Sequence, residues 1–273
     1  MFQAERRTTL LDGAFTFFTL TFHNAVRSIR SSHRDAMMAI LHNILQTLIM
    51  VGAFYMLFEL LGMRAMAIRG DFLLYVMSGI FVFMTHVKSA GAVMGADGPT
   101  SPMMKHLPMN QGISVCAAAL GALYTQTISM VAILGVYHLV WSPISFQDPF
   151  GTAMMLMLAW FSGCGLGLCL LAIKPWFPKF TGILNQIYSR VNMFASGKMF
   201  VANQLPTHLV AMFTWNPLFH IIDLGRGYMF VNYNPMKSSM TYPVVVSLIL
   251  LGVGILGVYF TGRHASASWD AAR

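Results

Sequence analysis

Few side chains in this sequence have the types and the spacing that catalysis requires. The best candidates are His220, Asp223 and Arg226, which are three residues apart and therefore share one face of a helix. His220 could serve as a base, but the sequence contains no G-x-S-x-G nucleophile motif and no H-E-x-x-H zinc motif. The pattern therefore predicts neither an enzyme nor a metal site.

ATP hydrolysis is not predicted either. The Gly-Lys pair at Gly197 and Lys198 lacks the glycine five positions before it, and Met199 stands where Ser or Thr would bind magnesium. The glycine-rich run 163–167 lies inside an apolar stretch, where small residues favour close packing of helices. We expect no cofactor on this chain, and any ATP and magnesium would bind to a partner.

The composition indicates which elements surround these residues. Of the 273 residues, 56% are hydrophobic and 10% are charged, whereas soluble domains carry roughly 25% charged residues. The 17 Lys and Arg and 9 Asp and Glu give a net charge of +8. The basic residues lie between apolar runs and not along one polar face, which favours a membrane protein over a nucleic-acid-binding one.

Six stretches are apolar and long enough to span a hydrocarbon core, which takes about 20 helical residues. These predicted spans are 36–61, 72–95, 112–141, 150–173, 182–201 and 243–262. In the segment 1–35, Phe15, Phe18 and Phe22 recur at helical spacing with Arg on the other side. This pattern predicts an amphipathic helix in the membrane interface, with packing on a soluble partner as the alternative. The fold class is therefore all-α integral membrane, with a transmembrane domain at 36–262 and a tail at 263–273.

The basic residues near the ends of the predicted spans indicate the orientation. Eleven Lys and Arg fall on the side of the two termini and four on the other side. By the positive-inside rule, both termini are predicted to be cytoplasmic. The two remaining cations, Arg190 and Lys198, lie inside the predicted fifth span.

The segment between the fifth and sixth spans has a pattern of its own. Two short apolar pieces, 205–214 and 217–231, are separated by Trp215, Asn216 and Pro217. Asn216 is a suitable N-cap, and proline fits the first turn of the helix that follows. Each piece is too short to cross a membrane, and we expect two half-helices in a re-entrant hairpin at 205–231. An ion pair between its aspartate and arginine, three residues apart, would fix it.

These residues also carry a family resemblance. The run Leu205-Pro206, Trp215-Asn216-Pro217-Leu218, His220, Asp223, Arg226 resembles the LP…WNPL-x-H-x-x-E-x-x-R segment of ABC-2 type permeases, above all capsular-polysaccharide export permeases. O-antigen and teichoic-acid export permeases are near relatives. The run 164–168 is similar to the C-G-x-G-L of that family, and PMMKHLP at 102–108 is similar to its cytoplasmic coupling segment. Asp223 stands where the family usually has Glu.

The resemblance implies a function and a set of partners. It implies the permease subunit of an ABC exporter that moves a polysaccharide, a capsular one above all, across the bacterial inner membrane. Two copies would form a homodimer among membrane lipids, and two copies of a separate ATPase subunit would dock from the cytoplasm. Periplasmic and outer-membrane export proteins are further expected partners, and nucleic acid is not. A permease for a lipid, haem or drug is the alternative, and an intramembrane enzyme is a remote one. The ATPase contacts would be made by Pro102, Lys105, His106 and Pro108.

A translocation pathway is predicted from charges and aromatic rings inside the spans. Arg190 and Lys198 are eight residues apart, so on a continuous helix they would share a face and could offset the charge of an anionic polymer. A structural pair with Glu59, or snorkelling to an interface, is the alternative. Sugar rings stack on aromatic faces, although aromatic residues also anchor membrane interfaces. The aromatic candidates are Phe54, Tyr55, Phe58, Tyr188 and Phe194.

Overall fold

The computed structural model describes residues 10–32, 36–60, 62, 71–97 and 111–264. Within these ranges the chain is helical and has no β-strand, so the predicted all-α fold class is confirmed. In chain order the helices are α1 (Leu10–Ser32), α2 (Ala36–Leu60), α3 (Phe72–Gly95), α5 (Gln111–Val140), α6 (Pro149–Ile173), α7 (Pro178–Ala195), α8 (Thr207–Phe213), α9 (Pro217–Met229) and α10 (Thr241–His264).

Among the described residues, five helices are long and apolar enough to cross a membrane, namely α2, α3, α5, α6 and α10. In lipid such apolar runs must satisfy their backbone hydrogen bonds internally, which is why they form helices. They coincide to within two residues at each end with the predicted spans 36–61, 72–95, 112–141, 150–173 and 243–262.

The predicted fifth span, 182–201, differs from what the structure shows. Helix α7 has 18 residues, ends at Ala195 and is not among the five. Gly197 has a φ of 77°, a left-handed conformation that glycine adopts without strain, and the chain turns there. The helix therefore stops before Lys198, and a sixth crossing stays a prediction.

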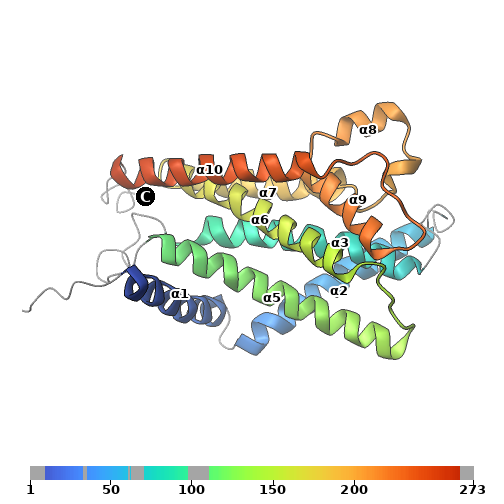
Figure 1. Ribbon diagram of the computed structural model, residues 1–273, viewed down its shortest axis with the longest axis horizontal. Helices are drawn as coiled ribbons and strands as arrows, with labels where there is room; N and C mark the ends of the chain where they lie inside the picture. Colours follow the sequence, from blue (N-terminus) through green and yellow to red (C-terminus); the bar gives the residue numbers. More distant parts are fainter. Residues whose placement is uncertain (1–9, 33–35, 61, 63–70, 98–110, 265–273) are drawn as a thin grey trace, which may run out of the picture.

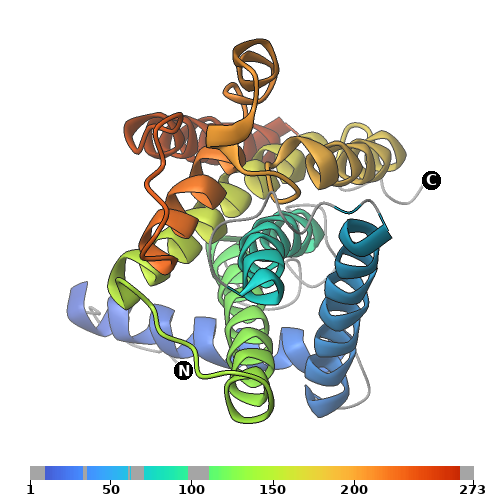
Figure 2. The ribbon, with the colours of Figure 1, turned by 90° about the vertical axis from the view of Figure 1, so that its right-hand side faces the viewer.

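Helices α3 and α6 form the centre of the bundle. Most of the apolar stretch of each is buried, whereas less than a third of the apolar stretch is buried in α2, α5 and α10. The long helices run along the molecule in Figure 1, and the end view in Figure 2 shows α3 in the middle. Helix α1 and the last turn of α10 lie at one end of the molecule, and α8 and α9 lie toward the other end.

Glycines on α6 allow it to approach α3 closely. A Cβ added at Gly163 would lie 2.3 Å from the carbonyl oxygen of His86, and one added at Gly167 would lie 2.7 Å from that of Ala90. Apolar helices associate in a membrane largely through van der Waals packing, which small residues at the contact improve. The packing role predicted for the run 163–167 is confirmed.

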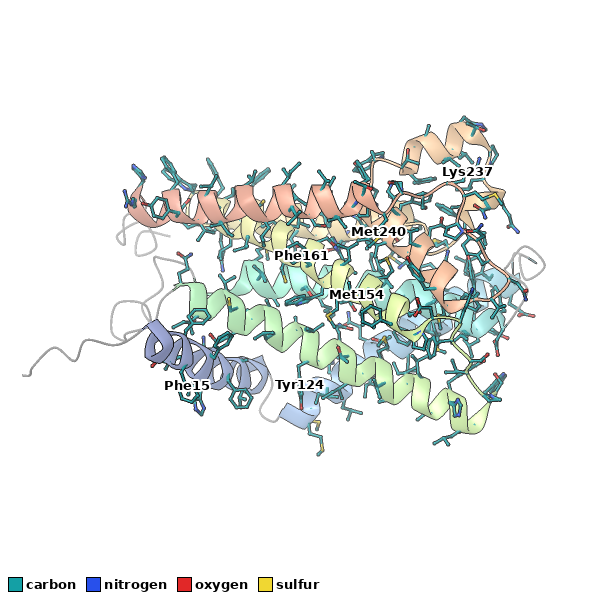
Figure 3. The ribbon with its side chains drawn as sticks, viewed as in Figure 1. Phe15, Tyr124, Met154, Phe161, Lys237 and Met240 are labelled. Carbon is teal, nitrogen blue, oxygen red and sulfur yellow. The ribbon has the colours of Figure 1, made fainter. Side chains whose placement is uncertain are left out.

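One face of α1 points away from the bundle. Phe15, Phe18 and Phe22 are exposed, whereas Thr21 on the other side is buried. Helix α1 packs against α5, and Phe15 lies on its outer side (Figure 3). Figure 2 shows α1 running crosswise behind α5. This geometry suits a helix in the membrane interface, the placement predicted for 1–35.

Candidate functional site

In the hairpin segment 205–231, the second helix, α9, is capped at its N-terminus by Asn216. The Asn216 side-chain oxygen accepts a hydrogen bond from the Leu218 N–H at 3.1 Å, and proline occupies the first turn of α9. The side-chain nitrogen donates to the Asn192 side chain at 2.8 Å and to the Ala195 carbonyl at 3.0 Å. The residue that caps α9 therefore also fastens it to the end of α7.

Replacing Asn216 with alanine should lower the free energy of unfolding by about 1–2 kcal/mol, because α9 loses its cap and buried polar groups on α7 lose a partner. Asn216→Asp keeps the capping oxygen and loses the donor, so its stability should fall between wild type and the alanine variant. Thermal unfolding in detergent measures both changes. An alanine variant as stable as the wild type would show that Asn216 does not stabilise α9 or its contact with α7.

His220 uses both of its ring nitrogens in structural contacts. Its Nδ1 accepts from the Ser239 N–H at 3.1 Å, so Nε2 carries the proton and donates to the Thr214 carbonyl at 2.8 Å. The ring also meets Tyr242 edge to face. In this arrangement no ring nitrogen is free to act as a base, and the side chain ties α8 and α9 to the start of α10.

Asp223 is also a structural residue, and its partners differ from the predicted one. It accepts hydrogen bonds from the hydroxyl of Tyr233 and, at 2.6 Å, from that of Ser238. Burial, reinforced by the nearby carboxylate, raises the pKa of Tyr233, which keeps this hydroxyl protonated as a donor. The chain that follows α9 thus returns to cover Asp223.

Arg226 binds backbone carbonyls and not Asp223, so the predicted Asp223–Arg226 ion pair is wrong. Its guanidinium donates to the carbonyls of Gly197 at 3.0 Å, Lys198 at 2.6 Å and Phe200 at 2.9 Å. These carbonyls lie in the turn that follows α7, where no helical ladder supplies their donors. The side chain is 1% exposed and lies over the Tyr75 ring at 4.1 Å. Arg226 therefore holds the turn 197–200 in place.

The predicted stripe of Arg190 and Lys198 on one helix face is also wrong. Helix α7 ends between them, Arg190 is exposed on α7, and Lys198 is 2% exposed. The Lys198 ammonium lies 3.7 Å from the ring centroid of Phe83 and 4.4 Å from that of Phe54. The Met50 sulfur lies 3.9 Å from the ammonium. We define the lysine cage as Lys198 with Phe83, Phe54 and Met50.

The aromatic candidates divide into packed and accessible rings. Phe54 and Phe58 are buried in the core, and Tyr55 packs against the ring of Phe72. The Tyr188 hydroxyl lies 2.8 Å from a ring nitrogen of His86. Among the predicted pathway rings, Phe194 is the one that the structure leaves largely open, with 60% of its side chain exposed. In the hairpin, Trp215 is equally exposed.

Phe194 belongs to an apolar face of α7 that the sequence analysis did not single out. The exposed residues of this face recur every three or four positions, which is one side of a helix. We define the α7 face as Phe180, Ile183, Ile187, Val191 and Phe194. Its helical period is visible in the sequence and could have identified it.

His86 is a second residue that the sequence analysis missed. Its Nδ1 lies 2.8 Å from the Ser162 hydroxyl on α6, and its Nε2 lies 2.8 Å from the Tyr188 hydroxyl on α7. A polar side chain in the middle of an apolar span is costly unless it is paired, and this was the available signal. The contact joins three helices at one point.

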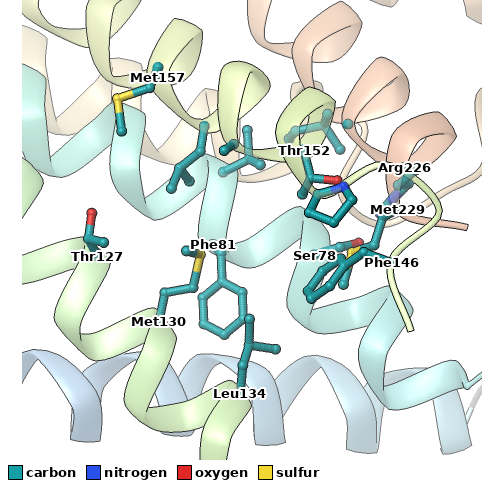
Figure 4. Close-up of a pocket in the computed structure, with 16 residues that line it drawn as sticks. Ser78, Phe81, Thr127, Met130, Leu134, Phe146, Thr152, Met157, Arg226 and Met229 are labelled. Atoms are coloured by element: carbon teal, nitrogen blue, oxygen red, sulfur yellow. The ribbon is translucent and has the colours of Figure 1, made fainter. Parts of the chain in front are cut away.

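A cavity of about 230 Å³ lies between α3, α5, α6 and α9. Its lining is mostly apolar, as Phe81, Met130 and Leu134 in Figure 4 illustrate. The hydroxyls of Ser78 and Thr152 donate to backbone carbonyls of their own chain segments at 2.7 and 2.9 Å. This lining offers few polar groups for a sugar.

The residues predicted to contact an ATPase cannot be placed on this fold. Pro102, Lys105, His106 and Pro108 lie outside the residues that the structure describes, as does most of the tail 263–273. The end of α3 at Gly95 and the start of α5 at Gln111, which flank the predicted coupling segment in the sequence, lie toward the end of the molecule where α1 lies.

Comparison with known proteins adds an independent observation. The chain is 24% identical over 200 residues to a polysialic acid transport protein, KpsM, of Escherichia coli, which covers 71% of this chain and 75% of that protein. A second Escherichia coli protein of the same name matches to the same extent. The chain is a distant relative of the capsular-polysaccharide export permeases. This relationship confirms the resemblance drawn from the WNPL-x-H segment. No protein-family model matches the chain.

Proposed function

We propose that this chain is the membrane-spanning permease subunit of an ABC exporter that moves a polysaccharide, a capsular one above all, across the bacterial inner membrane. The observation that carries the proposal is the 200-residue match to polysialic acid transport proteins. The five helices able to cross a membrane within the described ranges fit a role that requires a membrane-spanning chain. The hairpin residues of the resemblance hold the hairpin to α7, to the turn 197–200 and to the segment before α10.

The energy for export would come from a separate ATPase, because the sequence itself has no phosphate-binding loop with a magnesium ligand. Two ATPase copies would dock at the cytoplasmic end through the segment 102–108 and the interface helix α1. The chain would carry no cofactor of its own, and both of its termini would lie in the cytoplasm.

A homodimer would supply the second wall of the pathway. The α7 face and the exposed apolar side of α2, which includes Met37, Leu41 and Leu45, are wide surfaces on a single chain. Contiguous exposed apolar surface marks either lipid contact or a protein interface. A second copy on these faces would enclose Arg190, Phe194 and the pathway between the two chains.

Arg190 is the cation that such a pathway would present to its cargo. The relatives are named for polysialic acid, a polymer of acidic sugars, and we extend an acidic polysaccharide to this chain. Arg190→Gln should lower export about tenfold, because a fixed positive charge raises the local concentration of an anionic polymer. Arg190→Lys should retain most of it. Surface polysaccharide per cell, at equal amounts of the chain in the membrane, is the measurement. Unchanged export by the glutamine variant would remove Arg190 from the pathway.

Native purification tests the exporter proposal. A tagged chain in mild detergent should retain an ATPase subunit whose ATP turnover depends on this chain and rises with acidic polysaccharide. The absence of any associated ATPase would contradict the proposal. Turnover that rises with a lipid, haem or drug, and not with polysaccharide, would favour the alternative permeases.

A further inference from the structure

The lysine cage holds a cation in an unusual setting. Lys198 is 2% exposed, and its ammonium contacts the Phe83 and Phe54 rings and the sulfur of Met50. Within the described part of the chain, no carboxylate pairs with it. A buried ammonium without an acidic partner has lost its hydration, and aromatic faces offset that loss only in part. The ammonium would therefore gain free energy by leaving the cage for a carboxylate.

The backbone of Lys198 is held by hydrogen bonds and by close packing. Arg226 donates to three carbonyls of the turn 197–200. The turn also presses against α3, because a Cβ added at Gly79 would lie 2.9 Å from the Lys198 Cβ. The turn, α3 and α9 thus form one unit, and the lysine side chain extends from this unit toward α2.

Helix α2 is the less constrained partner in the cage. It supplies Phe54 and Met50, and it packs mainly on α3 and α5 at the periphery of the bundle. Its apolar stretch is mostly exposed. The contact between the ammonium and the α2 ring therefore links a peripheral helix to the unit that carries the hairpin.

We propose that Lys198 is a latch that holds α2 against the turn 197–200 and opens when an acidic group of the transported polymer takes the ammonium. The inference rests on the proposed function, which supplies the acidic polysaccharide. A hydrogen bond from an ammonium to a carboxylate is stronger than its contact with a ring, so the acid displaces the cage. With the ammonium withdrawn, α2 moves away from the turn 197–200, the distance between α2 and α7 increases, and the wall of the pathway moves.

The separation of α2 from α7 tests the latch directly. Spin labels at Met56 and Val191, both exposed, report this distance in the full-length chain reconstituted in nanodiscs, with the three cysteines replaced and labelled chains diluted. Oligosialic acid should increase the population of longer distances, and a neutral maltooligosaccharide of equal length should not. A wild-type chain that shows no response to the acidic oligomer would overturn the latch.

The matched variants separate the latch from general charge effects. Lys198→Met leaves an apolar side chain in the cage and should reduce the response to oligosialic acid by roughly fivefold or more. Lys198→Arg should keep the response, and so should Lys179→Met, which removes an exposed lysine at the start of α7. Equal responses of Lys198→Met and wild type would overturn the proposal.

A second variant, which keeps Lys198, distinguishes loss of the latch from misfolding of the Lys198→Met chain. Phe54→Leu keeps the cation and removes the ring that α2 contributes to the cage, so it should raise the long-distance population without any oligosaccharide. A distance distribution identical to wild type would again overturn the latch. Export in cells is scored separately. A chain that is required for export but shows none of these distance changes refutes the latch alone, whereas a chain that is not required for export refutes the proposed function.

Discussion

Arg226→Met should destabilise the fold more than any other single exchange of a charged residue in the hairpin. The variant leaves the carbonyls of Lys198 and Phe200 without this donor, leaves the Gly197 carbonyl with only the Phe200 N–H at 3.4 Å, and removes the guanidinium from the ring of Tyr75. Unpaired buried acceptors each cost 1 kcal/mol or more, so the free energy of unfolding should fall by about 3–5 kcal/mol. Thermal unfolding of the purified chain in detergent measures the loss.

Two controls define what Arg226 contributes. Arg226→Lys should not restore stability, because an ammonium cannot match the planar fork that reaches three acceptors while it lies over a ring. Arg263 on α10 also lies over a ring, that of Tyr259 at 4.5 Å, but it is exposed. Arg263→Met should therefore change stability by less than about 1 kcal/mol. Similar losses in Arg226→Met and Arg263→Met would show that the carbonyl contacts do not hold the turn.

Gly163→Ala should separate the two central helices. The added methyl would lie 2.3 Å from the His86 carbonyl oxygen, which is backbone and cannot rotate away. Overpacking of this kind costs about 1–3 kcal/mol in ordinary cores, and we expect about 3 kcal/mol because α3 itself must shift. The contact of His86 with Ser162 should weaken as well.

The matched control for this exchange is Gly52→Ala on α2. A Cβ at Gly52 meets nothing within 4 Å, and alanine favours the helix over glycine. This variant should be as stable as wild type, or more stable by up to about 1 kcal/mol. Thermal unfolding and the yield of monodisperse protein report both variants. A neutral Gly163→Ala would mean that α3 and α6 are not in backbone contact.

The helices of this fold could largely be predicted from the sequence. An apolar run of more than twenty residues has few structures open to it in lipid, so the range 72–95 predicts α3 to the residue. The second hairpin helix could be placed from Asn216 and Pro217, whose capping preferences act within one turn. Local chemistry decides both features, and a single sequence contains it.

The contacts at the candidate site could not be predicted in the same way. Spacing places Arg226 and Asp223 on one face, but it does not show that the turn after α7 brings three carbonyls closer to the arginine. The sequence predicts a continuous helix through Lys198, because a single glycine in an apolar segment does not show that the chain turns there. Which of many aromatic rings would surround the lysine depends on the packing of α2 and α3.

The location of polysaccharide in a strain that lacks this chain tests the central claim most directly. If the chain is the permease of a polysaccharide exporter, the deletion strain should accumulate polymer inside the cell and lose it from the surface. Re-expression of the wild-type chain should restore surface polymer, and sugar analysis of the trapped material would identify the cargo. Surface polysaccharide that is unchanged in amount and composition in the deletion strain would contradict the proposed function.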